Sequence, residues 1–170
     1  MKRLTLMRHA NAQWKDPQIA DFDRLLSRRG VSEAEAIGRR LMELQLVPDR
    51  VLTSNARRAA QTAEMVVREL GVNARNTRSD ESLYLAEPQD ILKVVQSTGP
   101  RIEHVMVVGH NPGISELAQL LAPQRGIGEL GTAALCTLTF DTDSWKEVEA
   151  RTLRDSFSES PPVRLFALWA

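Results

Sequence analysis

The sequence is poor in cysteine, in net charge and in long apolar runs, and each shortage excludes a class of protein. Its single cysteine, Cys136, cannot form an internal disulfide or a cysteine-rich metal site. The 22 Lys and Arg residues balance the 22 Asp and Glu residues, which argues against a chain-wide basic surface for nucleic acid. No segment approaches the roughly 18 apolar residues that span a bilayer, and no secretory signal pattern opens the chain. We therefore expect a cytoplasmic protein that binds neither nucleic acid nor membranes.

What the sequence does contain favours a single α/β domain over residues 1–170. With 42% hydrophobic residues, a chain of this length can fill one core. The expected strands are residues 4–7, 50–54, 104–110, 133–140 and 148–153, and the last two could pair as a hairpin. The expected helices are one that Ser32 and Glu35 begin as a capping box, one over residues 57–70, and two that open at Pro88 and Pro112. This order predicts a three-layer α/β/α sandwich with a mainly parallel central sheet.

Polar side chains follow three of the predicted strands at the point where each strand ends. Arg8 and His9 follow the first, Ser54 closes the second shortly before Arg57 and Arg58, and His110 comes after Gly109 at the end of the strand over residues 104–110. The carboxyl ends of parallel strands meet at one edge of a sheet, where open α/β folds bind ligands. The sequence thus predicts that two histidines and several arginines converge there.

The chemistry of these side chains indicates an anion site beside a nucleophile. Cations in the first turn of a helix oppose its dipole, at a cost of up to about 1 kcal/mol. A bound phosphate would offset that cost, and we assign this role to Arg58 and treat Arg57 as solvated. Arg8 and Arg58 should keep a neighbouring imidazole neutral, and a neutral imidazole can attack an electrophilic anion. His104 only precedes its strand and is interpreted as a packed or surface residue.

Four segments resemble one family when taken together. They are "LMRHA" (6–10), "DFDRLLSRRG" (21–30), "SNARRAAQT" (54–62) and "VVGHNP" (107–112). These motifs resemble the histidine phosphatase superfamily, which has the phosphoglycerate-mutase-like fold, and most of all its short SixA-type phosphohistidine phosphatases. The resemblance covers residues 4 to about 140. It implies that His9 attacks phosphorus, that Arg8 and Arg58 hold the phosphoryl oxygens, and that His110 donates a hydrogen bond to them, with no metal or other cofactor.

Two further site residues are assigned with an alternative beside each. Many relatives carry a glutamate that begins an E-x-x-Y-like segment, and Glu81 of "ESLY" matches it as the general acid or is an exposed loop carboxylate. Asn11 is a loop-capping residue that could add an oxyanion contact. A zinc site made by His9, His110 and Glu81 is disfavoured, because the adjacent arginines would repel a dication.

The short connection between residues 70 and 86 predicts a shallow site, which would admit a phosphorylated side chain of another protein. We expect a phosphatase that hydrolyses phosphohistidine on a histidine-phosphotransfer protein through a covalent phosphohistidine intermediate. One alternative is a small-molecule phosphomonoesterase whose loop 13–24, with Phe22 and a half-buried Trp14, shapes a pocket for a phosphate ester. The other is a non-catalytic phosphoprotein-binding module.

The C-terminal segment is unusually apolar for a chain end. It carries Leu165, Phe166, Leu168 and Trp169 after two prolines. We expect these side chains to dock on the domain or to form a dimer patch, and the oligomeric state stays open.

Overall fold

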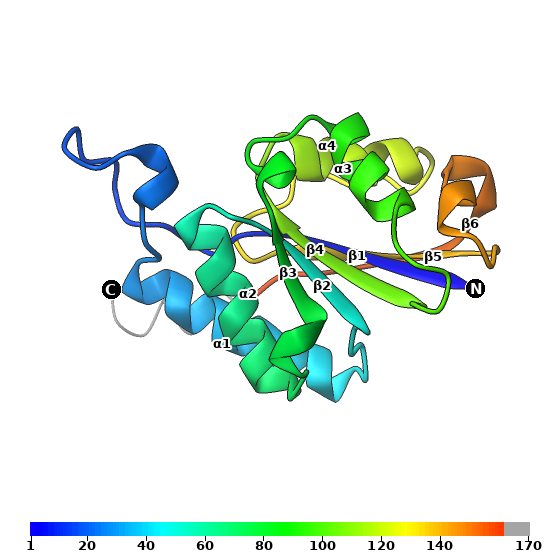
Figure 1. The fold of residues 1–170 in the computed structure, drawn as a ribbon, viewed down its shortest axis with the longest axis horizontal. Helices are drawn as coiled ribbons and strands as arrows, with labels where there is room; N and C mark the ends of the chain where they lie inside the picture. Colours follow the sequence, from blue (N-terminus) through cyan, green and yellow to red (C-terminus); the bar gives the residue numbers. More distant parts are fainter. Residues whose placement is uncertain (162–170) are drawn as a thin grey trace.

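A six-stranded sheet forms the centre of the computed structural model, which describes residues 1–161 (Figure 1). The order of the strands across the sheet is β3-β2-β4-β1-β5-β6. Their bounds are β1 Lys2–Arg8, β2 Arg50–Ser54, β3 Thr77–Asp80, β4 His104–Gly109, β5 Leu135–Phe140 and β6 Leu153–Glu159. The first four in chain order run parallel, whereas β5 and β6 are antiparallel to their neighbours. The predicted mainly parallel sheet is therefore confirmed.

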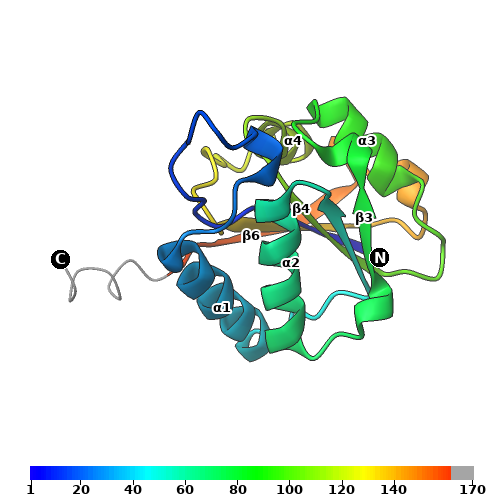
Figure 2. The ribbon, with the colours of Figure 1, turned by 60° about the vertical axis from the view of Figure 1, so that its left-hand side comes forward.

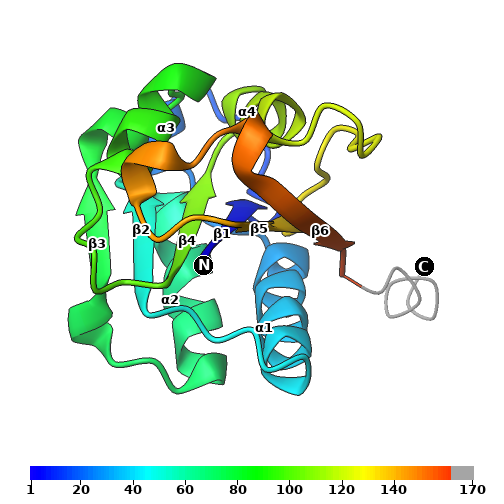
Figure 3. The same ribbon diagram turned by 90° about the vertical axis from the view of Figure 1, so that its right-hand side faces the viewer.

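Helices cover both faces of this sheet (Figure 3). Helices α1 (Arg28–Glu43) and α2 (Arg57–Leu70) lie on one face, and α3 (Pro88–Gln96) and α4 (Gly113–Leu121) lie on the other. Each layer has its own apolar core, because alternate residues of the central strands point to opposite faces. In β1, Leu4 and Leu6 pack under α3 and α4, and Met7 packs under α1 and α2. The predicted α/β/α sandwich is confirmed. No helix within residues 1–161 is long and apolar enough to cross a membrane.

Helix α1 begins earlier than the predicted capping box allows. Its N-cap is Ser27, whose hydroxyl oxygen accepts a hydrogen bond from the Gly30 backbone N–H at 3.0 Å. A Cβ atom on Gly30 would lie 2.0 Å from the carbonyl oxygen of Asn11, so only glycine lets the loop after β1 pass this close. The box of Ser32 and Glu35 was wrong, because both residues lie inside the helix.

The two edge strands are where the predicted strand positions fail. Strand β3 was not predicted, and β6 begins at Leu153, after a 3-10 turn at Ala150–Thr152, whereas we expected a strand over residues 148–153. Both strands are largely exposed, so neither needs the apolar run that reveals a buried strand. Val148, whose apolar side chain suggested a strand, is buried in the apolar core that α3 and α4 cover.

The predicted packed or surface His104 is a packed histidine at the start of β4. Its Nε2 atom lies 2.8 Å from the Thr5 hydroxyl, which lies 2.9 Å from the Thr137 hydroxyl. Burial, with help from the charge of Arg3, lowers the pKa of His104 from its ordinary 6.5 to about 4. The folded protein therefore binds fewer protons than the unfolded chain between these two pH values.

We expect the free energy of unfolding to fall as the pH drops from about 7 to about 4. The depressed pKa of His104 contributes stability that is complete above its unfolded value and is lost toward its folded value, on the order of 3 kcal/mol. The lowered pKa values of His9 and His110 act in the same direction. Urea titrations between pH 7.5 and pH 4.5 measure the fall. The variant His104→Gln should show a smaller fall, and an equal one would contradict the assignment.

Candidate active site

A pocket of about 430 Å³ lies where β1, β2 and β4 end. Figure 2 shows the loop after β1 lying beside the N-terminal end of α2 at this edge of the sheet. We call this pocket the strand-end pocket. Its lining residues are Arg8, His9, Asn11, Ala12, Lys15, Asp21, Arg24, Arg58, Leu85, His110, Asn111 and Thr132. The structure thus brings together Arg8, His9, Arg58 and His110 from three distant segments.

His9 follows β1 directly and presents an unprotonated nitrogen to Arg58. Its ring is 8% exposed, and its Nδ1 atom lies 2.7 Å from the carbonyl oxygen of Ala10. A carbonyl can only accept, so Nδ1 carries the proton and donates it there. The Nε2 atom accepts from Arg58 Nε at 3.3 Å. Burial, followed by the charges of Arg58 and Arg8, lowers the pKa of His9 to about 4. At neutral pH the ring is uncharged, and the lone pair on Nε2 accepts the hydrogen bond from Arg58, which Nε2 must give up when it attacks phosphorus.

Arg58 connects both histidines of the strand-end pocket to Asp21. It lies in the first turn of α2, is 2% exposed, and contacts both histidines. Its Nη2 atom lies 3.3 Å from His110 Nδ1 and donates to Asp21 Oδ2 at 3.0 Å, while Nη1 donates to the Asp21 carbonyl at 2.7 Å. Arg57, one position earlier, is exposed. The guanidinium of Arg58 is therefore fixed in place before any anion arrives.

His110 is held by groups on both sides of its ring. Because Arg58 can only donate, His110 Nδ1 accepts, and the ring proton is on Nε2, which donates to the Ser54 hydroxyl oxygen at 2.7 Å. Burial, with the neighbouring His9 and Arg58, lowers the pKa of His110 to about 3. To donate from Nδ1 to a phosphoryl oxygen, the ring needs a proton on that nitrogen. It gains one by taking a second proton, which a bound dianion would favour, or by changing tautomer while the Ser54 hydroxyl donates to Nε2.

Arg8 has an unused donor in this pocket. Its Nη1 atom donates to the Leu130 carbonyl at 3.3 Å, but its buried Nε atom has no hydrogen-bond partner within the described structure. An unpaired buried donor costs about 1–3 kcal/mol, and a charged one costs more. An anion in the strand-end pocket would supply the missing acceptor.

Sequence reasoning missed Asp21, which lies in a 3-10 helix at Asp21–Asp23. Burial alone would raise the pKa of its carboxyl, but hydrogen bonds and charges from Tyr84, Arg58 and Arg24 outweigh burial and lower it to about 2. Tyr84 donates to Oδ2 at 2.8 Å, and Arg24 pairs with Oδ1 at 3.0 Å. Asp21 is thus an ionised carboxylate that holds two arginines. Its place within the "DFDR" segment was the only available signal.

The remaining candidates lie elsewhere or act differently than expected. Glu81 is exposed in a 3-10 helix after β3 and does not line the strand-end pocket, so this geometry does not support it as the general acid. Asn11 does line the pocket, and its Oδ1 atom accepts from the Ser27 hydroxyl at 2.6 Å, the loop-capping contact that was expected. Trp14 is 96% exposed, so the half-buried placement was wrong: Trp14 is in neither of the two apolar cores.

Within the described residues, no three His, Cys, Asp or Glu side chains are grouped so as to hold a metal ion. The strand-end pocket instead gathers arginine donors around an uncharged imidazole, an arrangement suited to a phosphoryl group. The fold and this site together define a phosphoryl-transfer protein of the α/β class.

Comparisons with known proteins agree with this class. The profile of the histidine phosphatase superfamily (branch 1) matches residues 4–83. An uncharacterized protein of Mycobacterium tuberculosis is 38% identical over 120 residues, which cover 71% of this chain and 72% of that relative. The chain belongs to the histidine phosphatase superfamily, and its activity is that of a phosphatase.

Two solved structures refine the comparison. The SixA protein of Agrobacterium tumefaciens matches with a TM-score of 0.76 and 28% identity, covering 82% of this chain and 92% of that one. Within the superfamily, the likeness of this chain is to the SixA type. A mycobacterial glucosyl-3-phosphoglycerate phosphatase matches with a TM-score of 0.61 and 15% identity, over 94% and 98% of the two chains, and shares the fold alone.

Proposed function

We propose that this protein hydrolyses phosphohistidine on another protein through transient phosphorylation of His9. The observation that carries the reaction type is the unprotonated Nε2 of His9 within 3.3 Å of Arg58 Nε, in the strand-end pocket. The likeness to SixA-type phosphohistidine phosphatases supports the choice of substrate.

The first step transfers the phosphoryl group to the protein. The lone pair of His9 Nε2 attacks phosphorus, the bond from phosphorus to the substrate imidazole breaks, and the departing nitrogen keeps the electron pair. Arg8 and Arg58 bind the phosphoryl oxygens, where charge gathers in the transition state. A departing imidazole can take its proton from solvent, so the absence of Glu81 from the pocket lining does not prevent this step.

The second step releases phosphate. Water attacks phosphorus of phosphohistidine 9, the bond to Nε2 breaks, and the nitrogen regains its lone pair. The hydrogen bond from Nδ1 to the Ala10 carbonyl keeps the ring in the same orientation through both steps. The arginines bind the same oxygens in each transition state, so one arrangement of charges serves both.

Trp14 and Lys15 support a macromolecular substrate. Trp14 is 96% exposed, and Lys15, the next residue, lines the strand-end pocket. An exposed tryptophan is a common anchor of protein–protein interfaces. A partner that inserts a phosphorylated side chain into the pocket would therefore also contact this loop.

One observation favours the small-molecule alternative. Lys15 and Arg24 line the pocket in addition to Arg8 and Arg58, which would suit a compact substrate with a second anionic group. The fold shared with a glucosyl-3-phosphoglycerate phosphatase is compatible with this alternative.

The two candidates differ in how they respond to Trp14→Ala. For the proposed function, kcat/KM on a phosphorylated histidine-phosphotransfer protein should exceed that on small phosphomonoesters. Trp14→Ala should lower the first value about tenfold or more, as loss of an interface anchor does, and leave the second unchanged. Steady-state phosphate release measures both.

Met42→Ala is the matched control, since Met42 is an exposed apolar residue at the far end of α1. It should change neither value. Hydrolysis of small esters alone would replace the proposal with the phosphomonoesterase. Phosphoprotein binding without any turnover would indicate a binding module.

A further inference from the structure

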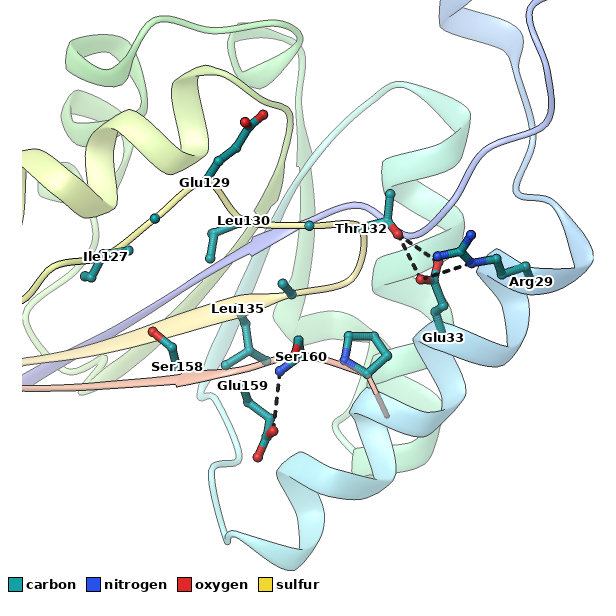
Figure 4. A pocket seen from close by; sticks show the side chains of 14 residues that line it. Arg29, Glu33, Ile127, Glu129, Leu130, Thr132, Leu135, Ser158, Glu159 and Ser160 are labelled. Atoms are coloured by element: carbon teal, nitrogen blue, oxygen red, sulfur yellow. Dashed lines mark hydrogen bonds and ion pairs between the residues drawn. The ribbon is translucent and has the colours of Figure 1, made fainter. Parts of the chain in front are cut away.

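A second and larger cavity of about 530 Å³ shares the lining residue Thr132 with the strand-end pocket. Figure 4 shows the residues that line this cavity. We call it the β6 groove. One wall is the loop before β5, and the other is the end of β6 with the residues that follow it. Ile127, Leu130 and Leu135 give it an apolar lining, and Glu129 adds negative charge, whereas Glu159 is already paired with Arg40 at 2.9 Å. The groove thus suits an apolar segment that carries a positive charge.

Residues 162–170 of the same chain have this apolar and positively charged character, and they follow directly on the wall of the β6 groove. Ser160 and Pro161 form part of the groove wall, and Pro161 is buried. Residues 162–170 follow at once with the sequence "PVRLFALWA", in which Arg164 is the one charged residue. Nine residues can reach about 30 Å when extended, enough to return across the groove.

We infer that residues 162–170 dock in the β6 groove of their own chain. The apolar side chains of this segment match the apolar lining, and Arg164 matches the charge of Glu129. Attachment at Pro161 makes the docking intramolecular, so a second copy would have to compete against a high effective concentration.

The docked segment lies next to the strand-end pocket because one residue borders both cavities. Thr132 lines the groove and the pocket, and its hydroxyl donates to Glu33 Oε2 at 2.8 Å. The other carboxylate oxygen of Glu33 accepts from the Asn11 backbone N–H at 2.9 Å. Figure 4 shows Glu33 between Thr132 and Arg29 at this end of the groove. An occupant of the groove therefore packs against a wall of the phosphoryl site.

The solvent exposure of Trp169 can be compared with that of the other two tryptophans in the same sample. Trp14 is 96% exposed and Trp145 is 2% exposed, while Trp169 belongs to the docking segment. With 5-fluorotryptophan in the full chain, the ¹⁹F shift between H₂O and D₂O reports the solvent exposure of each ring. We expect Trp169 to resemble Trp145, with a signal that does not depend on protein concentration.

Gly128→Arg is the variant that should displace the segment. A Cβ atom at Gly128 would meet nothing within 4 Å, so a larger side chain fits there without disturbing the fold. Because Gly128 lines the groove, an arginine at this position should repel a docked Arg164. Gly99→Arg makes the same change at an equally open site elsewhere. In Gly128→Arg alone, the Trp169 signal should move to the exposed value of Trp14, while Trp145 confirms that the fold is intact.

Two results would overturn the inference. A Trp169 ring as exposed as Trp14 in the unaltered protein, and unmoved by Gly128→Arg, would show that the segment does not dock. A Trp169 signal that shifts with concentration, together with a dimer mass in sedimentation equilibrium, would assign the groove to a second copy.

Discussion

Replacing His9 by alanine is expected to lower kcat for phosphate release by at least about 10³-fold, because it removes the Nε2 lone pair that attacks phosphorus. Nε2 of His9 is unprotonated and is contacted by Arg58 at 3.3 Å, so it needs no activation by a separate base. The residual activity should come from water attack on a phosphoryl group that the arginines still hold. Rapid-quench kinetics on the phosphoprotein substrate measure the loss.

The same variant should lose the covalent intermediate. Wild-type protein quenched during turnover of a ³²P-labelled donor should carry an acid-labile, alkali-stable label, as phosphohistidine does, and His9→Ala should carry none. His104→Gln is the matched control, since His104 is also buried but lies at the opposite end of the sheet. A persistent label on His9→Ala would place the phosphoryl group on another side chain and contradict the assignment.

The residues of the strand-end pocket that sequence reasoning found are those that follow buried strands directly. β1 and β4 set the positions of Arg8, His9 and His110, and the apolar residues that bury these two strands are visible in the sequence. Arg58 is set by the first turn of α2, which starts soon after β2. A parallel sheet brings these ends to one edge, so strand position alone predicts that the four residues meet.

The residues that were missed owe their place to the path of a loop. Asp21 lies far from any strand end in the sequence and reaches the pocket because Arg58 and Arg24 hold it. Neither periodicity nor strand position encodes such a contact. Glu81 shows the converse error: its motif is present, but the 3-10 helix after β3 contributes Tyr84 to the site and leaves the carboxylate exposed.

The fold likewise divides into elements that the sequence predicts and elements that it does not. Buried strands and amphipathic helices follow patterns that the core imposes, and their alternation along the chain predicts a mainly parallel sheet. Strands β3 and β6 lie at the two edges of the sheet, where one side of each strand has no neighbour and burial is slight. Their position is fixed by backbone pairing with β2 and β5, which side-chain patterns do not record.

Arg58 is the second residue whose loss should have a large effect, and its neighbour supplies the control. Arg58→Ala should lower kcat/KM by about 10²–10³-fold, the usual cost of removing one fixed donor to a developing oxyanion. Arg58→Lys should recover little of this, because an ammonium cannot reproduce the fork that contacts His9, Asp21 and His110. Arg57→Ala, which removes an exposed arginine, should stay within twofold of wild type.

The pH profile distinguishes a direct electrostatic role from a general loss of structure. Arg58 is among the positive charges that lower the pKa of His9 to about 4, after the larger contribution of burial. Activity needs neutral His9, so the wild-type rate should fall only as the pH approaches 4. Without Arg58 the pKa of His9 rises, and the acid limb of kcat/KM should begin at higher pH with the same substrate. An unmoved acid limb, or equal losses in Arg57→Ala and Arg58→Ala, would show that the guanidinium does not act on His9.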